Sequence, residues 1–436
     1  MKRNKKRMKL LLSATLLGFS ALITSGIYPN VSAQEATSHW TRGAASQVSM
    51  NEGNTAPVIQ MDELQKIAAN YYIWDTWPLQ DRNGNVAVVN GYKIIFALTV
   101  PNDVLPGKRH DTSEIRYFYS KDGKSWKLGG LLFNDGKELG SRQWAGSAII
   151  NKDGKVHIFY TATGQKNESH LTYEQRIATT TGKIITNNSH VAFTNWSDHK
   201  IILQPDGHYY QTKEQSEQGD SSYAFRDPYF FQDPKTDEEY IVFEANSAGI
   251  LAERTCGLEQ NGANGAKQFN GSIGIAKAVD GSLTEFEMLP PLLEANCVNE
   301  ELERPTLSVK GNRYYLFAKT HPEKFSPGLD APEGLYGFTS DTLVGGYHPL
   351  NGSGLVIANP KENPYQAYSW MVMQNGTVIS FVNYVKVEGK NIYEIGEQSP
   401  EYQLAHFGGM LAPSLKLSIT GDQTKIVHEK QQGVFH

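Results

Sequence analysis

The sequence of 436 residues predicts an all-β fold, a β-propeller of five blades with few short helices. Five segments share one pattern, in which a polar turn precedes a run rich in β-branched and aromatic residues, as is typical of a hairpin. The five turns begin at Asn90, Asp153, Asp237, Gly311 and Asn375. Their spacing of about 60 to 85 residues is too long for a solenoid repeat but fits four-stranded blades that carry insertions.

Helix signals are weak and local. The stretch "QMDELQKIAANYYIW" from Gln60 has apolar residues at helical spacing and predicts one short helix leading into the first strand. Residues 56–436 are expected to form a single propeller domain. The segment 34–55 before it is either flexible or wraps over the surface of that domain.

The first 33 residues have the features of a secretory signal peptide. Lys and Arg crowd the start, an apolar run extends from Leu10 to about Ile23, and "VSA" ends at Ala33. The apolar run is shorter than the roughly 20 residues of a membrane-spanning helix, which disfavours the alternative of an uncleaved anchor. We therefore expect a secreted, extracellular protein that is not associated with a membrane after cleavage.

The net charge of the chain disfavours some classes of binding partner. Cleavage after Ala33 would remove six of the 41 basic residues and none of the 46 acidic ones, so the net charge would change from −5 to −11. A chain that acidic disfavours nucleic-acid binding and suits neutral substrates such as sugars. We expect a monomer without nucleic-acid partners.

Cysteine is nearly absent. The only two cysteines, Cys256 and Cys297, lie in a chain with an export signal and are not spaced like metal ligands. A single disulfide is therefore favoured, and the alternative is a pair of buried thiols.

Acidic and aromatic residues precede each of the five hairpin turns by about 7 to 16 residues. In a propeller the innermost strand of each blade comes first and lines the central channel, so these residues are expected to converge on one funnel-shaped cavity. The motifs are "WDTWP", "RQWAGSA", "FRDPY", "ELERPT" and "QAYSW". They contain the carboxylates Asp75, Asp227, Glu301 and Glu303, the cations Arg226 and Arg304, and the indoles Trp74, Trp77 and Trp144.

Several carboxylates around one cavity repel one another unless one keeps its proton and cations offset the others. Glycoside chemistry uses that arrangement: a retaining mechanism needs one ionised carboxylate as nucleophile and one carboxylic acid as proton donor. The indoles beside Asp75 would then form the wall for a sugar ring, and Asp75 would attack the anomeric carbon.

Three motifs carry a family resemblance. "WDTWP", "FRDP" and the E-x-E-R of "ELERP" resemble, in the same order, the signature motifs of the bacterial levansucrase and inulosucrase family, glycoside hydrolase family 68. The likeness extends from about Asp62 to about Leu411. It implies a five-bladed propeller and an enzyme that cleaves sucrose through a covalent fructosyl-enzyme and transfers fructosyl units to a growing fructan or to water. Levan is favoured over inulin as the product because it is commoner in the family.

The resemblance also implies roles for individual residues. Asp75 matches the nucleophile, Asp227 the carboxylate that stabilises the transition state, and Glu303 the general acid/base. The residues that match substrate-binding positions are Trp74, Trp144, Ser147, Arg226, Glu301, His321 and Tyr368. Structural alternatives stay open for several of these residues, since Trp144 and Tyr368 could be core aromatics and Glu301 a solvated neighbour of Glu303.

The chain departs from the Gram-positive pattern of the family and resembles its Gram-negative branch. Ala145 replaces a Ser of the "WSGSA" motif, and Trp370 stands where His is more usual. His321 stands where Gram-positive members have an Arg on the glucosyl side, which removes a bidentate clamp. The pair Cys256 and Cys297 resembles the disulfide of some Gram-negative-like members.

No cofactor is expected. The acidic calcium site of Gram-positive members is not evident. "DRNGN" from Asp81 and "NKDG" from Asn151 resemble calcium loops only faintly, because neither has the closing Glu, and hairpin turns are favoured. A structural calcium stays an open alternative.

Two rival functions are weighed against sucrose-dependent transfer. A pure sucrose or fructan hydrolase of invertase type would carry an N-D-P-N-G motif and a C-terminal β-sandwich, and neither is present. A non-catalytic sugar-binding propeller would keep the Trp and Arg residues but would not need Glu303.

Overall fold

Antiparallel strands dominate the computed structural model, which describes residues 37–219, 221–250, 254, 256 and 265–435. The predicted signal peptide, residues 1–33, lies outside these described residues. None of the helices formed by the described residues has both the length and the apolar character that crossing a membrane requires. The described part of the chain is mostly β with few short helices, as predicted.

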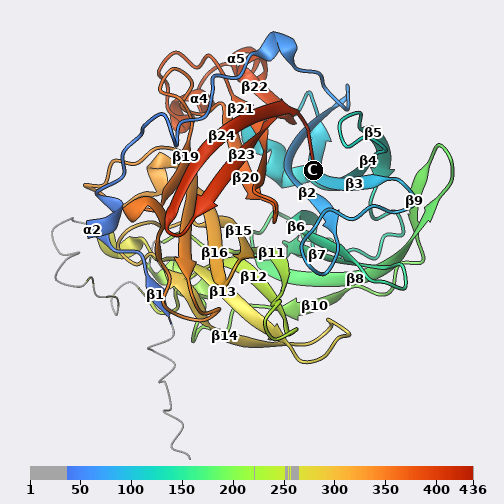
Figure 1. Cartoon of the computed structure of the whole chain (residues 1–436), viewed down its shortest axis with the longest axis horizontal. Helices are drawn as coiled ribbons and strands as arrows, with labels where there is room; N and C mark the ends of the chain where they lie inside the picture. The colour runs from blue at the N-terminus through green and yellow to red at the C-terminus, as the bar shows by residue number, and fades with distance from the viewer. Residues whose placement is uncertain (1–36, 220, 251–253, 255, 257–264, 436) are drawn as a thin grey trace, which may run out of the picture. The chain divides into compact units, whose positions relative to one another are not determined.

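The strands form five meanders that follow one another along the chain (Figure 1). Meander 1 contains β2 (Tyr71–Gln80), β3 (Lys93–Pro101), β4 (Glu114–Ser120) and β5 (Lys127–Leu131). Meander 2 contains β6 (Arg142–Ile150), β7 (Lys155–Thr163), β8 (Gln175–Thr186), β9 (Val191–Thr194) and β10 (Lys200–Leu203). Meander 3 contains β11 (Phe225–Gln232), β12 (Glu239–Asn246), β13 (Gly271–Ala278) and β14 (Phe286–Glu294).

Meanders 4 and 5 complete the series. Meander 4 contains β15 (Glu303–Lys310), β16 (Arg313–Thr320), β17 (Gly334–Ser340), β18 (His348–Pro349) and β19 (Leu355–Ala358). Meander 5 contains β20 (Ala367–Val372), β21 (Thr377–Tyr384), β22 (Phe407–Leu411), β23 (Pro413–Thr420) and β24 (Gln423–Gln432). In every meander the first three strands pair antiparallel in chain order.

The five predicted hairpins are present, each joining the first and second strands of a meander. Every connecting turn contains a residue with positive φ, which is why Gly, Asn or Asp is needed there. These residues are Gly91, Gly154, Asp237, Gly311 and Gly376.

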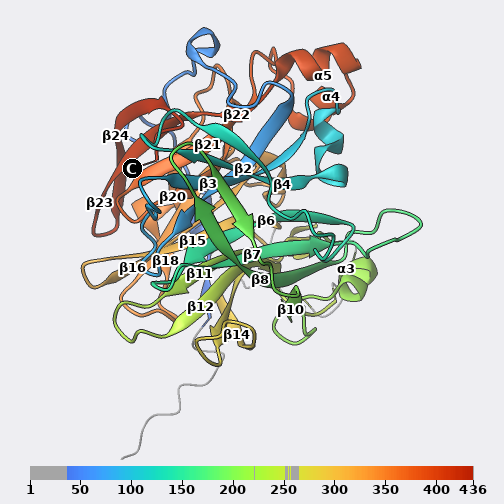
Figure 2. The same ribbon diagram turned by 90° about the vertical axis from the view of Figure 1, so that its right-hand side faces the viewer.

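The first strands contact one another in a closed cycle. β2 contacts β6, β6 contacts β11, β11 contacts β15, β15 contacts β20, and β20 contacts β2. Meander 5 therefore returns to meander 1, and Figures 1 and 2 both show β21 and β22 beside β2. Residues at matching positions of the five first strands are thus neighbours in space although they are far apart in the sequence.

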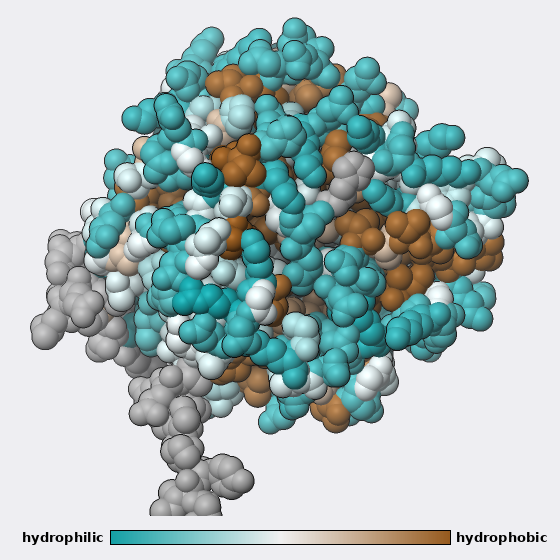
Figure 3. Space-filling view, viewed as in Figure 1, coloured by the Kyte–Doolittle hydropathy of each residue, from teal (hydrophilic) through white to brown (hydrophobic). Residues whose placement is uncertain are grey.

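The second strands form much of the core. Nearly every residue of β3, β7, β12, β16 and β21 is buried. Strands that are covered on both faces read as continuous apolar runs, which explains why the five β-rich runs do not alternate with polar residues. The face shown in Figure 3 is mostly hydrophilic, with hydrophobic side chains in scattered patches.

The prediction of a helix from Gln60 was wrong. Only Met61–Glu63 form a helical turn, of 3-10 type, and Leu64 is already extended. Gln60 provides no side-chain cap, and a short isolated helix is marginal without strong packing of its apolar face. The apolar spacing instead reflects an irregular segment in which Ala68 is buried against the core.

Residues 37–55 pack against meanders 3 and 4. β1 (Ser38–His39) pairs in parallel with β14, and the short helix α2 (Arg42–Ala45) follows. Trp40 is 1% exposed, and its indole N–H donates to the backbone carbonyl of Ser353 at 3.1 Å. Burying an indole of this size stabilises by about 2–3 kcal/mol, which holds the segment on the meanders.

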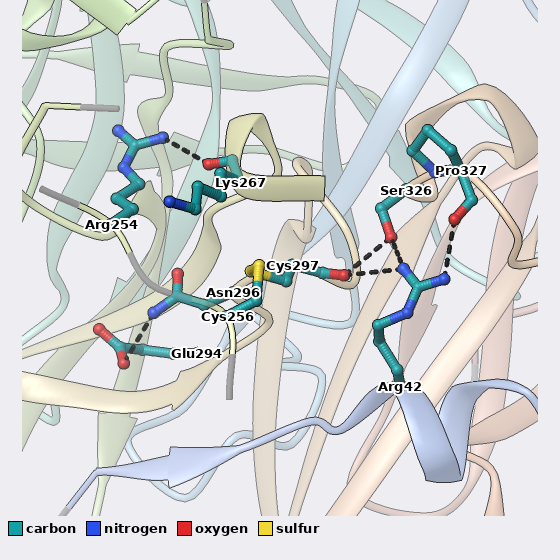
Figure 4. The surroundings of a disulfide bond; sticks show 9 residues. All are labelled: Arg42, Arg254, Cys256, Lys267, Glu294, Asn296, Cys297, Ser326 and Pro327. Atoms are coloured by element: carbon teal, nitrogen blue, oxygen red, sulfur yellow. Dashed lines mark hydrogen bonds between the residues drawn. A yellow bond between two sulfur atoms is a disulfide. The ribbon is translucent and has the colours of Figure 1, made fainter. Parts of the chain in front are cut away.

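A disulfide joins Cys256 and Cys297, as the sequence predicted (Figure 4). It ties the connection between β12 and β13 to the segment before β15. Arg42 reinforces the same place, because its guanidinium donates to the backbone carbonyls of Cys297 at 3.1 Å and Pro327 at 2.8 Å.

Removing this bond is expected to lower the free energy of unfolding by up to about 4 kcal/mol on the chain-entropy argument, because the bond closes a loop of 41 residues. The variant Cys256→Ser/Cys297→Ser should unfold at lower urea concentration than the wild type. Dithiothreitol should lower the wild-type midpoint to that of the variant and leave the variant unchanged. Equal midpoints for oxidised wild type and variant would contradict a stabilising role.

Candidate active site

The start of each first strand lies at the same end of its meander. Arg142, the first residue of β6, pairs with Thr163, the last of β7, and Thr163 also pairs with Gln175, the first of β8. The connection between the second and third strands therefore lies beside the start of the first. In the five meanders the described residues of these connections are 102–113, 164–174, 247–250 with 254, 256 and 265–270, 321–333, and 385–406.

Each first strand also carries an irregularity close to its start. The pairing register shifts after Trp74, Trp144, Arg226, Glu303 and Tyr368. A bulge of this kind redirects the side chains beside it.

In four of the five strands, the residue that follows this position has a positive φ. These residues are Asp75 (47°), Asp227 (61°), Arg304 (43°) and Ser369 (58°). Non-glycine residues adopt this conformation at a cost of about 1 kcal/mol or more, and such strain concentrates at functional sites. The same strained backbone conformation therefore occurs at the same position of the first strand in four of the five meanders.

Arg304 holds Asp75. Its guanidinium lies 3.8 Å from Asp75 Oδ1, donates to the Ser369 hydroxyl, and donates to the Thr76 carbonyl at 3.2 Å. Burial alone would raise the pKa of Asp75, but Arg304 and the Ser369 hydroxyl together hold that pKa below its ordinary value. Asp75 is therefore ionised at neutral pH, as a nucleophile must be.

Arg226 holds the other carboxylates together. Its Nη2 lies 3.3 Å from both Glu303 Oε1 and Glu301 Oε2, and its Nε lies 2.9 Å from Glu244 Oε2. Asp227 Oδ2 is 4.0 Å from Arg226 Nε. One cation between four acidic groups lowers the repulsion that would otherwise separate them.

Glu303 is the most accessible of these carboxylates, with a side chain that is 22% exposed. The Tyr368 hydroxyl donates a hydrogen bond to its Oε2, and Arg226 contacts its Oε1. Each oxygen thus has one donor, and one edge of the group stays open to a ligand.

Asp227 is more deeply buried, with a side chain that is 8% exposed. Burial raises its pKa to about 7, Arg226 works against this shift, and the negative charge of Asp75 adds to it. The Asp227 backbone N–H donates to the Thr161 hydroxyl at 2.9 Å, which fixes the strained residue to β7.

His321 stacks on Tyr368 with ring centroids 4.0 Å apart, and its Nδ1 bonds the fully buried carboxylate of Glu333. Burial alone would lower the pKa of His321, but Glu333 raises it to about 9, with help from Glu303 and Glu301. His321 is therefore a cation at neutral pH. It supplies positive charge beside Tyr368 and Glu303.

Glu301 joins the same side of the cluster. Lys324 Nζ lies 3.5 Å from its Oε2 and 2.9 Å from Glu300 Oε1. Burial works against ionisation of Glu301, but Lys324, Arg226 and His321 lower its pKa to about 2.

A row of aromatic rings begins at Trp74, the residue before Asp75. The ring of Trp74 packs edge-on against His110, and His110 packs edge-on against Trp144. Trp74 is fully buried, and among the described residues its indole N–H has no hydrogen-bond partner. Burial lowers the pKa of His110 to about 3, and Arg109 adds to this, so His110 is neutral.

Two predicted residues lie mainly in the core. Trp77 is fully buried and stacks on Phe96, and the Arg304 guanidinium lies 6.0 Å from its ring centroid. Ser147 is 1% exposed, and its hydroxyl accepts from the backbone N–H of Phe230 at 3.0 Å, so it connects β6 to β11.

Comparison with known proteins decides the family. Residues 30–436 match the levansucrase/invertase model of glycoside hydrolase family 68. The chain belongs to this family. It is 35% identical to a levansucrase of Pseudomonas savastanoi pv. glycinea over 419 residues, which cover 90% of this chain and 91% of that protein. It is thus a levansucrase-type sucrose fructosyltransferase, and the resemblance predicted from its three motifs is confirmed.

Solved structures of the family resemble the fold. An inulosucrase from Halalkalicoccus jeotgali bound to kestose matches with a TM-score of 0.86 and 43% identity, over 92% of this chain and 97% of that one. A levansucrase from Gluconacetobacter diazotrophicus matches with a TM-score of 0.79 and 28% identity, over 92% of each chain. A β-fructofuranosidase catalytic domain from Microbacterium saccharophilum matches with a TM-score of 0.81 and 32% identity, over 92% of this chain and 93% of that one.

Sequence reasoning missed several residues of the cluster. Lys319 is fully buried and donates to the carbonyls of Arg304 at 3.0 Å and Trp370 at 3.3 Å, which joins meanders 4 and 5. Burial, aided by Arg304, lowers its pKa to about 7. A charged residue inside an otherwise apolar second strand, as in "YYLFAKT", was the available signal, and Glu244 in "YIVFEA" carries the same one.

Glu301, Glu303 and His321 offer ligand atoms within 4.8 Å of one another, a spacing that could hold a metal ion. These atoms face Arg226, Lys324 and Tyr368, so cations and a hydroxyl already satisfy the carboxylates.

Proposed function

We propose that this enzyme is secreted, cleaves sucrose by a retaining double displacement through a covalent fructosyl-enzyme, and transfers fructosyl units to a growing fructan or to water. The observation that carries the proposal is the meeting of Asp75, Asp227 and Glu303, from three first strands, around Arg226 and Arg304. The five meanders are the blades of a five-bladed β-propeller, and the closed cycle of first strands supports this.

In the first step, Asp75 attacks the anomeric carbon of the fructosyl unit. A bond forms from that carbon to an Asp75 oxygen, the bond to the glycosidic oxygen breaks, and Glu303 gives its proton to the departing glucose oxygen. The lowered pKa of Asp75 supports this role, since the attacking group must be ionised. Asp227 accepts hydrogen bonds from fructosyl hydroxyls and stabilises the positive charge of the transition state.

In the second step, Glu303 is the base. It takes the proton from a hydroxyl of the acceptor, the acceptor oxygen bonds to the anomeric carbon, and Asp75 leaves. Water in place of a sugar acceptor gives free fructose. The exposed edge of Glu303 and its anchoring by Tyr368 support a group that exchanges a proton with two successive partners.

His321 binds the glucosyl side of sucrose. It keeps its positive charge through its bond to Glu333 and lies against Tyr368, close to the acid/base. A charged imidazole donates a hydrogen bond to a sugar oxygen from one fixed direction, whereas a guanidinium offers two parallel donors.

The charge of His321 gives a pH prediction. The wild-type KM for sucrose should rise as the pH approaches 9, where His321 loses its proton. In Glu333→Gln the carboxylate that raises the pKa is gone while burial still lowers it, so the rise in KM should begin at lower pH. Glu323→Gln is the matched control, because Glu323 bonds Tyr365 and not His321. Identical KM–pH curves for wild type and Glu333→Gln would contradict the assignment.

Product analysis tests the whole proposal. The purified protein is incubated with sucrose, and glucose, fructose and polymer are measured separately. Glucose should exceed fructose, and the difference should appear as fructan. The absence of glucose release would contradict the proposal, and equal glucose and fructose without polymer would identify a hydrolase. NMR of the polymer then decides the linkage, for which we propose levan.

A further inference from the structure

The aromatic row beside Asp75 extends outward to a tyrosine that the reaction above does not use. Trp144 lies 6.4 Å from Tyr173, measured between ring centroids, and follows Trp74 and His110 in the row. Tyr173 belongs to the connection 164–174 between β7 and β8, at the end of meander 2 where β6 starts. The row therefore leads from the catalytic strand β2 to the outside of the site.

Tyr173 is unusual because it is both exposed and held in place. It is 43% exposed, yet its hydroxyl donates to Asp111 Oδ1 at 2.7 Å. The Arg142 guanidinium lies 4.8 Å from its ring centroid. Arg142 is itself almost fully buried and donates to the Thr172 carbonyl at 2.7 Å and to Glu168 Oε1 at 3.2 Å.

Trp144 is fixed in the same way. Its indole N–H donates to the His110 carbonyl at 2.9 Å, and the Arg142 guanidinium lies 5.7 Å from its ring. The buried guanidinium of Arg142 thus lies close to the rings of both Trp144 and Tyr173. A ring that is fixed before a ligand arrives loses little conformational entropy on binding.

This arrangement suits a chain of sugars. Aromatic faces pack against the apolar C–H face of a sugar ring, and the polar tip of Tyr can bond a hydroxyl. In the proposed reaction the end of the acceptor fructan must enter the site at Glu303, and the rest of the acceptor must leave it over the surrounding surface. We propose that Tyr173 is an acceptor-binding residue that supports a fructosyl unit of the growing chain outside the catalytic cluster. The proposal rests on the proposed function.

The test compares sucrose cleavage with acceptor use. Glucose release measures cleavage, and the dependence of transfer on added kestose measures acceptor binding. In Tyr173→Ala the KM for kestose should rise roughly two- to tenfold, as expected for loss of one aromatic contact. The KM for kestose should change by a larger factor than kcat/KM for sucrose. The polymer chains should be shorter, and a larger share of the fructosyl units should be transferred to water.

Two further variants sharpen the test. Tyr173→Phe keeps the ring and should restore most of the acceptor affinity. Ile185→Ala removes an exposed apolar side chain near the far end of β8, the strand that follows Tyr173, and should change neither quantity. An unchanged KM for kestose and unchanged chain lengths in Tyr173→Ala would overturn the inference.

Equal losses of glucose release and transfer in Tyr173→Ala would also overturn it, because Tyr173 would then support the catalytic cluster and not the acceptor. Failure of the proposed function is a separate result. It would appear in the wild type as the absence of glucose release.

Discussion

Glu303→Ala is expected to lower kcat for glucose release by about 10²- to 10⁴-fold, because it removes the proton donor to the leaving oxygen. The KM for sucrose should change much less, since Arg226 and Trp74 stay in place. The substitution also frees the Tyr368 hydroxyl and one contact of Arg226, but it leaves no buried charge unpaired because Glu244 and Glu301 still face Arg226.

Two comparisons separate this effect from a general loss of folding. Glu303→Gln keeps the shape of the side chain but cannot transfer a proton, so it should be about as inactive as Glu303→Ala. Glu285→Ala, at an exposed glutamate away from the cluster, should behave like the wild type. A near-normal kcat in either Glu303 variant would move the acid/base role to another residue.

Asp75→Asn is expected to lower sucrose cleavage by about 10⁴-fold or more, because a neutral amide cannot form the covalent intermediate. Asparagine is the right replacement on structural grounds. Asp75 has a φ of 47°, and Asn tolerates that conformation better than most residues. The amide can also still accept a hydrogen bond from Ser369 or Arg304.

The measurement is glucose release at saturating sucrose, with circular dichroism to confirm folding. Asp341→Asn is the matched control, since Asp341 is an exposed aspartate that also contacts an arginine, Arg313. An Asp75→Asn variant that retains more than a small share of the wild-type rate would exclude Asp75 as the nucleophile.

The turns and motifs made the overall organisation predictable. The five hairpins follow from short-range rules, since a residue that adopts positive φ must precede each β-rich run. The clustering of Asp75, Asp227 and Glu303 followed from their positions about 7 to 16 residues before those turns. Their proximity required only that the first strands be neighbours, which the closed cycle provides.

The bulges in the first strands could not be predicted from the sequence. Nothing in the letters of "WDTWP" or "AYSW" states that Asp75 and Ser369 adopt positive φ, because this strain is imposed by packing between meanders. The same limit explains why Lys319 and Glu333 were missed. Their partners lie on other meanders or across a long connection, so the charge in "YYLFAKT" could be noticed in the sequence but its role could not be assigned.

The predicted helix from Gln60 failed for a related reason. Apolar residues at helical spacing also fit an irregular segment that buries some of them, and local propensity is too weak to decide between the two.

Peptide mapping of the trapped intermediate tests the central claim most directly. Wild-type protein is mixed with sucrose, quenched with acid within one turnover, digested and analysed by mass spectrometry. The account predicts a fructosyl group on the peptide that contains Asp75 and none there in Asp75→Asn. A fructosyl group attached to a different carboxylate, such as Asp227, would contradict it.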